Sequence, residues 1–213
     1  EVLECDVVSL HVPLTSASVH PTLNLIGDAE LTILTKNAIL INACRGGVVD
    51  ELALKSLLLT REDIMTVFDV WENEPTIQSS LAQCVDIATP HIAGYSAEAK
   101  SNATKILALE FERHFRLGDA IEEEASESKP DVLDVEDAPG ELAQWGTLLT
   151  ALPLDELSEQ FKRALSDGVG AETFDTFRQK LLTRREFMSS HLRRDTYSLF
   201  QQQQLTVLGF RFE

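Results

Sequence analysis

The sequence predicts an α/β fold with a parallel sheet, followed by a separate small unit. Short apolar runs alternate with segments of helical spacing, which is typical of parallel strands joined by helices. Proline ends the first and last of these runs, at Pro13 and Pro90. An acidic stretch with little periodicity, residues 118–141, then predicts a linker before the second unit. The expected strands are residues 6–12, 38–42, 65–70 and 85–89.

The remaining elements follow from helical spacing and from capping residues. Asp28 and Asp50 are placed to cap the first two helices. Residues 205–212 have strand character, although Gly209 leaves their register open. The expected helices are residues 28–34, 51–59, 97–117, 154–165 and 173–188.

Composition excludes several classes of function. A formal net charge of −17 counts against nucleic-acid binding. No run approaches the roughly 20 apolar residues that span a bilayer, and the first residues do not resemble a signal peptide. The cysteines, Cys5, Cys44 and Cys84, are few and widely spaced. They predict a cytoplasmic protein with neither a metal site nor a disulfide framework.

A first candidate site residue is Arg45, which follows an expected strand and precedes Gly46 and Gly47. Open α/β sheets bind ligands at the carboxyl edge of the strands. A guanidinium at this edge can hold a carboxylate through two parallel hydrogen bonds. The alternative is an ordinary surface arginine in a turn.

A second group of candidates follows the strand at residues 65–70. Asp69 closes this strand, and Glu72 and Glu74 lie in a loop that ends at Pro75. Asp69 could contact an amide or a nicotinamide ring, and Glu74 could orient a histidine. The alternative is that all three acids are hydrated loop residues.

The third candidate is His91, which follows Pro90 at the end of the last strand, with Gly94 nearby. An isolated histidine is usually structural. Beside a carboxylate, however, its tautomer is fixed and it can act as an acid or base. His11, His20, His114 and His191 have no comparable setting.

The three motifs resemble those of the D-isomer-specific 2-hydroxyacid dehydrogenases, in the same order and at similar spacing, over about the first 117 residues. They are N-x-x-R-G-x-x-V-D at 42–50, D-V-W-E-x-E-P at 69–75 and T-P-H-I-A-G-Y at 89–95. The resemblance implies that residues 1–92 are the C-terminal half of a Rossmann-type NAD-binding domain. Residues 93–117 would then form a helix that returns to the substrate domain.

The resemblance also implies a role for each residue. His91 is the general base for the substrate hydroxyl, Glu74 supports His91, and Arg45 binds the substrate carboxylate and the developing carbonyl oxygen. The residues expected beside NAD are Ala43, Cys44, Arg45, Asp69 and Gly94. Tyr95 is expected to contact the substrate.

Further details resemble one branch of this family, whose members act on a small phosphorylated hydroxy acid and carry a C-terminal dimerisation domain. These details are Cys44, Tyr95 and the tail at 174–187. They predict that residues 142–213 form a small α+β dimerisation domain and that the protein is a homodimer. Val12 replaces a threonine that contacts NAD in the family, and Phe187 replaces a tryptophan.

Two alternatives stay open. The chain could come from another 2-hydroxyacid dehydrogenase, acting on phosphoglycerate or glyoxylate, or it could be a non-catalytic NAD-binding or dimerisation fragment. The G-x-G-x-x-G turn that holds a pyrophosphate in this fold does not occur. We therefore expect the chain to begin within its dinucleotide-binding domain.

Overall fold

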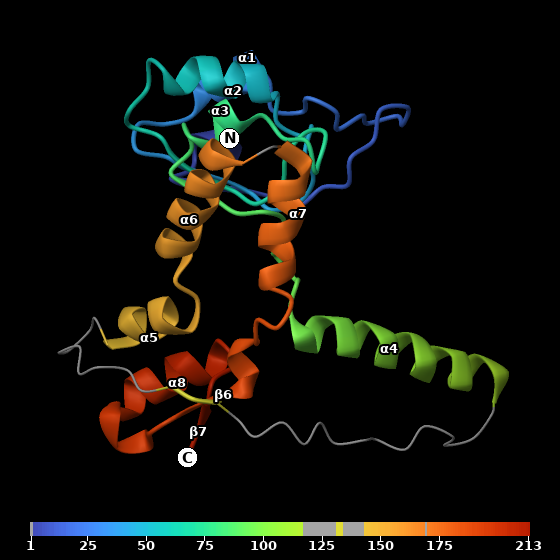
Figure 1. Ribbon diagram of the computed structural model, residues 1–213, viewed down its shortest axis with the longest axis vertical. Helices are drawn as coiled ribbons and strands as arrows, with labels where there is room; N and C mark the ends of the chain where they lie inside the picture. The colour runs from blue at the N-terminus through green and yellow to red at the C-terminus, as the bar shows by residue number, and fades with distance from the viewer. Residues whose placement is uncertain (1, 117–130, 134–142, 169) are drawn as a thin grey trace. The chain divides into compact units, whose positions relative to one another are not determined.

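The computed structural model describes residues 2–116, 131–133, 143–168 and 170–213, and its contacts divide the chain into two compact units (Figure 1). Unit 1 contains Glu1–Ala93 and Leu154–Lys180, and unit 2 contains Gly94–Pro153 and Leu181–Glu213. The grouping differs from the boundaries expected from the sequence, because residues 154–180 pack against the sheet. Most of the acidic stretch at 118–141 lies outside the described residues.

Unit 1 is built on a four-stranded sheet in the order β1-β2-β3-β4, and every pair in it is parallel. This confirms the predicted parallel α/β sheet. Because the strands are parallel, the loops that follow them all emerge at one edge, where such sheets bind ligands. The strands are β1 (Val7–Leu10), β2 (Ile39–Asn42), β3 (Met65–Phe68) and β4 (Ile87–Ala88).

Four helices of unit 1, α1, α2, α6 and α7, begin within three residues of where the sequence predicts them, whereas α3 is not predicted. Asp50 caps α2 as expected, since its side chain accepts hydrogen bonds from the amides of Leu52 and Ala53. The cap expected at Asp28 is wrong, because Gly27 occupies the N-cap position and Asp28 is the first helical residue. The helices are α1 (Asp28–Ile33), α2 (Glu51–Leu58), α3 (Ser79–Ala82), α6 (Leu154–Asp167) and α7 (Gly170–Lys180), with a 3-10 turn at Val2–Glu4.

Helices α6 and α7 complete the core of unit 1. Phe161 and Phe174 are buried in the same cluster as the side chains of the sheet, and their rings meet edge to face. The Ser158 hydroxyl accepts a hydrogen bond from the amide of Ala88 on β4, at 2.9 Å. The Lys162 ammonium donates to the carbonyl of Val85 at 2.5 Å. Polar atoms of β4 and of the turn before it are thus satisfied by the C-terminal part of the chain.

Unit 2 contains a second small parallel sheet, in the order β5-β6-β7. Its core holds Leu192, Tyr197, Leu205 and Phe210, and the Tyr197 and Thr147 hydroxyls are hydrogen-bonded at 2.8 Å. The elements are α4 (Ala97–Phe115), β5 (Asp131–Val132), α5 (Ala143–Ala151), β6 (Ser190–Leu192), α8 (Leu199–Val207) and β7 (Arg211–Phe212), with 3-10 turns at Phe187–Ser189 and Arg194–Thr196.

Two expectations for the C-terminal part of the chain are wrong. The strand expected over residues 205–212 begins only at Arg211, because α8 runs to Val207. Ser198 and Gln201 form a capping box that starts this helix, and Gly209 follows it at a φ of +104°. The helix expected over 173–188 ends at Lys180, and β6 follows from Ser190.

Along the described ranges, no helix combines the length and apolar character needed to cross a membrane.

Candidate active site

The segment after β4 is fixed by the carboxylate of Asp69, which lies just beyond β3 and is 5% exposed. Its Oδ1 accepts from the amide of Ile92 at 2.7 Å and from the Thr89 hydroxyl at 2.6 Å. Its Oδ2 accepts from the amide of Ala93 at 2.8 Å. The Asp69 carbonyl also accepts from the amide of His91 at 2.7 Å. One residue of the β3 loop therefore sets the path of the β4 loop.

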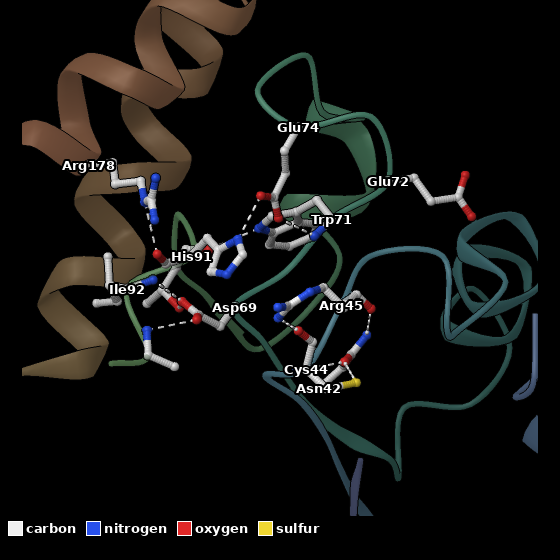
Figure 2. Close-up of polar contacts among 12 residues, drawn as sticks. Asn42, Cys44, Arg45, Asp69, Trp71, Glu72, Glu74, His91, Ile92 and Arg178 are labelled. Atoms are coloured by element: carbon white, nitrogen blue, oxygen red, sulfur yellow. Dashed lines mark hydrogen bonds and ion pairs between the residues drawn. The ribbon is translucent and has the colours of Figure 1, made fainter. Parts of the chain in front are cut away.

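His91 lies within this segment and pairs with a carboxylate from the β3 loop. Its Nδ1 is 2.7 Å from Oε2 of Glu74, and both side chains are about a quarter exposed (Figure 2). The φ of His91 is +55°, a left-handed conformation that costs a residue with a side chain about 1–2 kcal/mol. The surrounding hydrogen bonds offset this cost and hold the imidazole beside Glu74.

The Glu74 carboxylate is held in turn by Trp71. The Trp71 amide donates to Oε1 of Glu74 at 2.8 Å, which leaves Oε2 for the imidazole. The buried Trp71 indole donates to the carbonyl of Thr89 at 2.9 Å and so joins the loops after β3 and β4. The pairing of His91 with Glu74 is therefore part of a network that links two neighbouring strand ends (Figure 2).

The loop after β2 wraps around the buried side chain of Asn42. Its side-chain nitrogen, Nδ2, donates to the carbonyl of Arg45 at 3.3 Å, and its Oδ1 lies 3.1 Å from the Cys44 sulfur. Gly46 passes so close to the β3 loop that a Cβ at this position would lie 1.9 Å from the carbonyl oxygen of Trp71. Only glycine fits here. The Arg45 side chain is exposed and extends toward the region of His91 (Figure 2).

A pocket of about 530 Å³ opens at this edge of the sheet, and Arg45, Glu74 and His91 all line it. These are the three side chains that the sequence predicts to converge. The other lining residues are Leu14, Leu23, Asn24, Gly46, Gly47, Trp71, Glu72 and Asn73. The pocket thus offers a guanidinium and an imidazole paired with a carboxylate, which together can hold an anion and move a proton.

A buried carboxyl, Glu51, supports the wall of this pocket. It is 5% exposed at the start of α2, and its Oε1 accepts from the amide of Glu72 at 2.6 Å. Burial raises the pKa of Glu51 to about 7, and the charges of Glu72 and Glu74 act in the same direction, whereas the hydrogen bond from the Glu72 amide opposes them.

The other predicted site residues lie in different places. Ala43 and Cys44 belong to the β2 loop, where Ala43 is exposed and Cys44 is half-buried. Gly94 and Tyr95 belong to unit 2. Gly94 has a φ of +69°, which favours glycine, and the Tyr95 ring lies 4.1 Å from the Lys100 ammonium. In the part of the chain that the structure describes, no cluster of His, Cys, Asp or Glu could hold a metal ion.

Three residues that contact the site are not singled out by sequence reasoning. Trp71 could have been noticed from its place inside the motif at 69–75. Glu51 and Arg178 could not, because each contacts the site through residues distant in the sequence. The Arg178 guanidinium lies on α7 and donates to the carbonyl of His91 at 2.9 Å (Figure 2).

Comparison with known proteins identifies the family to which the chain belongs. Residues 1–93 match the family described as D-isomer specific 2-hydroxyacid dehydrogenase, NAD binding domain. Erythronate-4-phosphate dehydrogenase from Pseudomonas putida (strain W619) is 39% identical over 188 residues, which cover 86% of this chain and 50% of that protein. Its counterpart from Cellvibrio japonicus (strain Ueda107) is 37% identical over 224 residues, which cover 99% of this chain and 58% of that protein.

A third relative, erythronate-4-phosphate dehydrogenase from Shewanella sp. (strain DB6705), is 35% identical over 223 residues. The alignment covers 97% of this chain and 78% of that protein. The chain spans about half the length of the Pseudomonas putida relatives. Erythronate-4-phosphate dehydrogenase is the branch that the motif details and the tail resemble, so this resemblance is confirmed. With a relative of this identity matched over most of its length, the chain belongs to the D-isomer specific 2-hydroxyacid dehydrogenase family, whose NAD binding domain it carries.

Proposed function

We propose that this chain carries the acid/base centre and the nicotinamide end of the cofactor site of an NAD-dependent dehydrogenase. The substrate that we propose is 4-phospho-D-erythronate, which is oxidised to (R)-3-hydroxy-2-oxo-4-phosphooxybutanoate in vitamin B6 biosynthesis. The relatives named erythronate-4-phosphate dehydrogenase support this choice of substrate. The observation that carries the proposed chemistry is the 2.7 Å pairing of His91 with Glu74 in a pocket that Arg45 also lines.

His91 is the group that accepts the proton of the substrate hydroxyl. Its Nδ1 is engaged by Glu74, so Nε2 is the nitrogen available to the substrate. As the C2 hydroxyl loses its proton to Nε2, the imidazole becomes positively charged, and the Glu74 carboxylate stabilises that charge. In the reverse direction Nε2 returns the proton to the oxygen. Trp71 keeps Glu74 in place during both steps through its backbone amide.

Arg45 binds and polarises the substrate. The guanidinium lines the pocket, and its planar donors match a carboxylate at C1 through two parallel hydrogen bonds. The same positive charge stabilises the oxygen at C2 as the carbonyl forms. Binding C1 and the C2 oxygen together fixes the hydrogen of C2 in one direction, which is what stereospecific hydride transfer requires.

The donors and acceptors at this edge of the sheet fit a nicotinamide. Asp69 Oδ2 accepts one hydrogen bond from Ala93, and a carboxylate oxygen can accept more than one, so the carboxamide group is a suitable donor for it. Ala43, Cys44 and Arg45 form the loop after β2, the strand next to β3 in the sheet. Acceptance of the hydride from C2 is the chemistry that NAD supplies when bound.

The proposal is tested by substitution in the whole protein that contains this chain, with NADH formation as the assay. His91→Gln and Glu74→Gln should each lower kcat by about 100-fold or more, since general acid/base catalysis contributes at least that much. Arg45→Lys should raise KM and lower kcat because the planar fork is lost. His20→Gln is the matched control, since His20 is exposed. Turnover within about twofold of wild type in both His91→Gln and Glu74→Gln would rule out this function.

A panel of substrates separates the proposed activity from those of other family members. We expect the highest kcat/KM with 4-phospho-D-erythronate. Faster turnover of 3-phosphoglycerate or glyoxylate would reassign the substrate without changing the assigned roles of Arg45, Glu74 and His91. No turnover of any 2-hydroxy acid by the whole protein would favour the non-catalytic alternative.

We also propose that residues 142–213 contribute to a homodimer. Support comes from an apolar pocket of about 350 Å³ in unit 2, lined by α5 and α8. Trp145 at its rim is 58% exposed and Val207 is 88% exposed, and exposed apolar patches mark interaction sites. Val207→Glu should shift the protein toward a monomer in light scattering after size exclusion, whereas Gln203→Glu on the same helix should not. A wild-type monomer at all accessible concentrations would contradict the dimer.

A further inference from the structure

We propose that Arg178, on helix α7, is a positioning residue that holds the backbone of His91 in the conformation needed for proton transfer. This inference rests on the proposed role of His91 as the acid/base group. It extends the active site to the C-terminal part of the chain, which the sequence associates with dimerisation. The contact that motivates it is the hydrogen bond from Arg178 Nε to the His91 carbonyl at 2.9 Å (Figure 2).

The carbonyl of His91 accepts its hydrogen bond from a side chain on α7, whereas the neighbouring amides are held from the β3 loop. The amides of His91, Ile92 and Ala93 all donate to Asp69. Arg178 instead reaches the His91 carbonyl from α7. Between them, these contacts fix both sides of the peptide that joins His91 to Ile92, and the orientation of that peptide sets ψ of His91.

The conformation of His91 makes this contact consequential. At a φ of +55°, the residue lies in a region that a side chain disfavours, and it tends to return to the ordinary right-handed or extended regions. Either change would move Cβ and therefore the imidazole, which must stay 2.7 Å from Glu74. A charged donor on the carbonyl opposes this change more strongly than a neutral one would.

Helix α7 is anchored well enough to hold such a donor in place. Phe174, one turn before Arg178, is 2% exposed in the core of unit 1. Phe161 on α6 is completely buried beside it, with ring centroids 5.8 Å apart. The guanidinium is therefore presented from a packed helix, which limits the entropy lost when it holds the carbonyl.

The test compares Arg178→Met with Arg178→Lys. Methionine keeps an unbranched apolar stem but has no donor, whereas lysine keeps a positive donor. The first readout is the tautomer of His91 in this chain, from long-range proton–nitrogen NMR correlations, with His91→Gln identifying the signal. We expect a single tautomer with the proton on Nδ1 in the wild type, two tautomers in Arg178→Met, and at least partial return to one in Arg178→Lys.

The second readout is kinetic and uses the whole protein. Arg178→Met should lower kcat by about tenfold or more, as expected for the loss of a charge-assisted hydrogen bond, and should leave KM for NAD within about twofold. Arg178→Lys should recover part of kcat. Gln179→Ala, an exposed neighbour on the same helix, is the matched control and should behave as the wild type in both readouts.

Three results separate the outcomes. A wild-type tautomer and wild-type kcat in Arg178→Met would overturn the inference. So would a loss accompanied by changed amide signals of Phe174 and Ala88, because helix undocking would then account for it. If instead His91→Gln itself kept full turnover, the proposed function would fail, whereas the NMR readout would still report whether Arg178 orders His91.

Discussion

Replacing the buried carboxyl of Glu51 by an amide should remove a pH dependence from the stability of unit 1. In the wild type, the Glu72 amide lies 2.6 Å from Oε1 of Glu51. The side-chain oxygen of Glu51→Gln can still accept this hydrogen bond, so the substitution changes charge more than shape. The wild-type carboxylate is 5% exposed and close to the charges of Glu72 and Glu74. Its ionisation in the folded protein is therefore opposed both by burial and by repulsion.

The direction in which stability changes with pH follows from the pKa of Glu51 in the folded and in the unfolded state. Burial raises the pKa of Glu51 from its ordinary 4.5 to about 7 in the folded state. The folded state thus binds more protons than the unfolded state between these values. The stability linked to the protonated group is fully present below about pH 4.5 and is lost as the pH rises through about 7. The whole effect is on the order of 3 kcal/mol, since a tenfold change in proton affinity corresponds to about 1.4 kcal/mol.

The assay is urea unfolding at about pH 5 and about pH 8, in a Trp145→Phe background so that Trp71 fluorescence reports unit 1. The free energy of unfolding should fall between the two pH values by about 2–3 kcal/mol more in the wild type than in Glu51→Gln. Glu62→Gln removes an exposed carboxyl and should keep the wild-type difference. Parallel pH profiles for wild type and Glu51→Gln would refute the reasoning.

Two further substitutions test one carboxylate in each unit. Burial raises the pKa of Glu98, but hydrogen bonds from Ser189 and Arg185 outweigh it and bring the pKa to about 2. The stability from Glu98 is therefore present above about pH 4.5 and is lost as the pH falls through about 2. Glu98→Gln should lower the unfolding free energy of unit 2 by about 2 kcal/mol at neutral pH, and an unchanged acid-unfolding midpoint would contradict this. Asp69→Asn should destabilise unit 1 by about 2–4 kcal/mol in thermal unfolding, because an amide donor then faces backbone donors; a change below about 0.5 kcal/mol would argue against the hydrogen-bond scheme.

The parallel sheet could be predicted from the sequence because buried strands leave a direct signal. The strands of unit 1 lie in apolar runs that are too short for a helix. Polar residues close these runs, such as Asn42 at the end of β2 and Asp69 just after β3. Parallel strands then bring their loops to one edge. The convergence of Arg45, Glu74 and His91 on one pocket follows from this geometry.

The second unit was harder to predict because its signals are ambiguous. Residues 205–208 are mostly apolar, and Thr206 and Val207 are β-branched, which suits a strand as well as a buried helix. The capping box at Ser198 and the burial of Leu205 in a core with Tyr197 decide for the helix α8. A similar ambiguity occurs in unit 1, where the sequence predicts Asp28 as the N-cap of α1 and the structure has Gly27 in that position.

The contacts that refine the site join residues too far apart in the sequence for any local pattern to reveal them. Glu51 meets Glu72 across 21 positions, and Arg178 meets His91 across 87. Neither spacing reflects a periodicity of a helix or a strand. Such contacts depend on how α2 and α7 pack against the sheet, and this packing is a property of the whole core.

The geometry of His91 depends more on Asp69 than on its own motif. Glycine would adopt the φ of +55° without cost, but only histidine supplies the imidazole, so the fold must hold a disfavoured conformation. Each hydrogen bond from this segment contributes about 1 kcal/mol, and the two amides bound to the Asp69 carboxylate together match the cost of about 1–2 kcal/mol. Both hydrogen bonds require that the Asp69 carboxylate lies within reach of the amides of Ile92 and Ala93. A longer side chain with the same charge, as in Asp69→Glu, would displace that carboxylate, so the required property is its position as well as its charge.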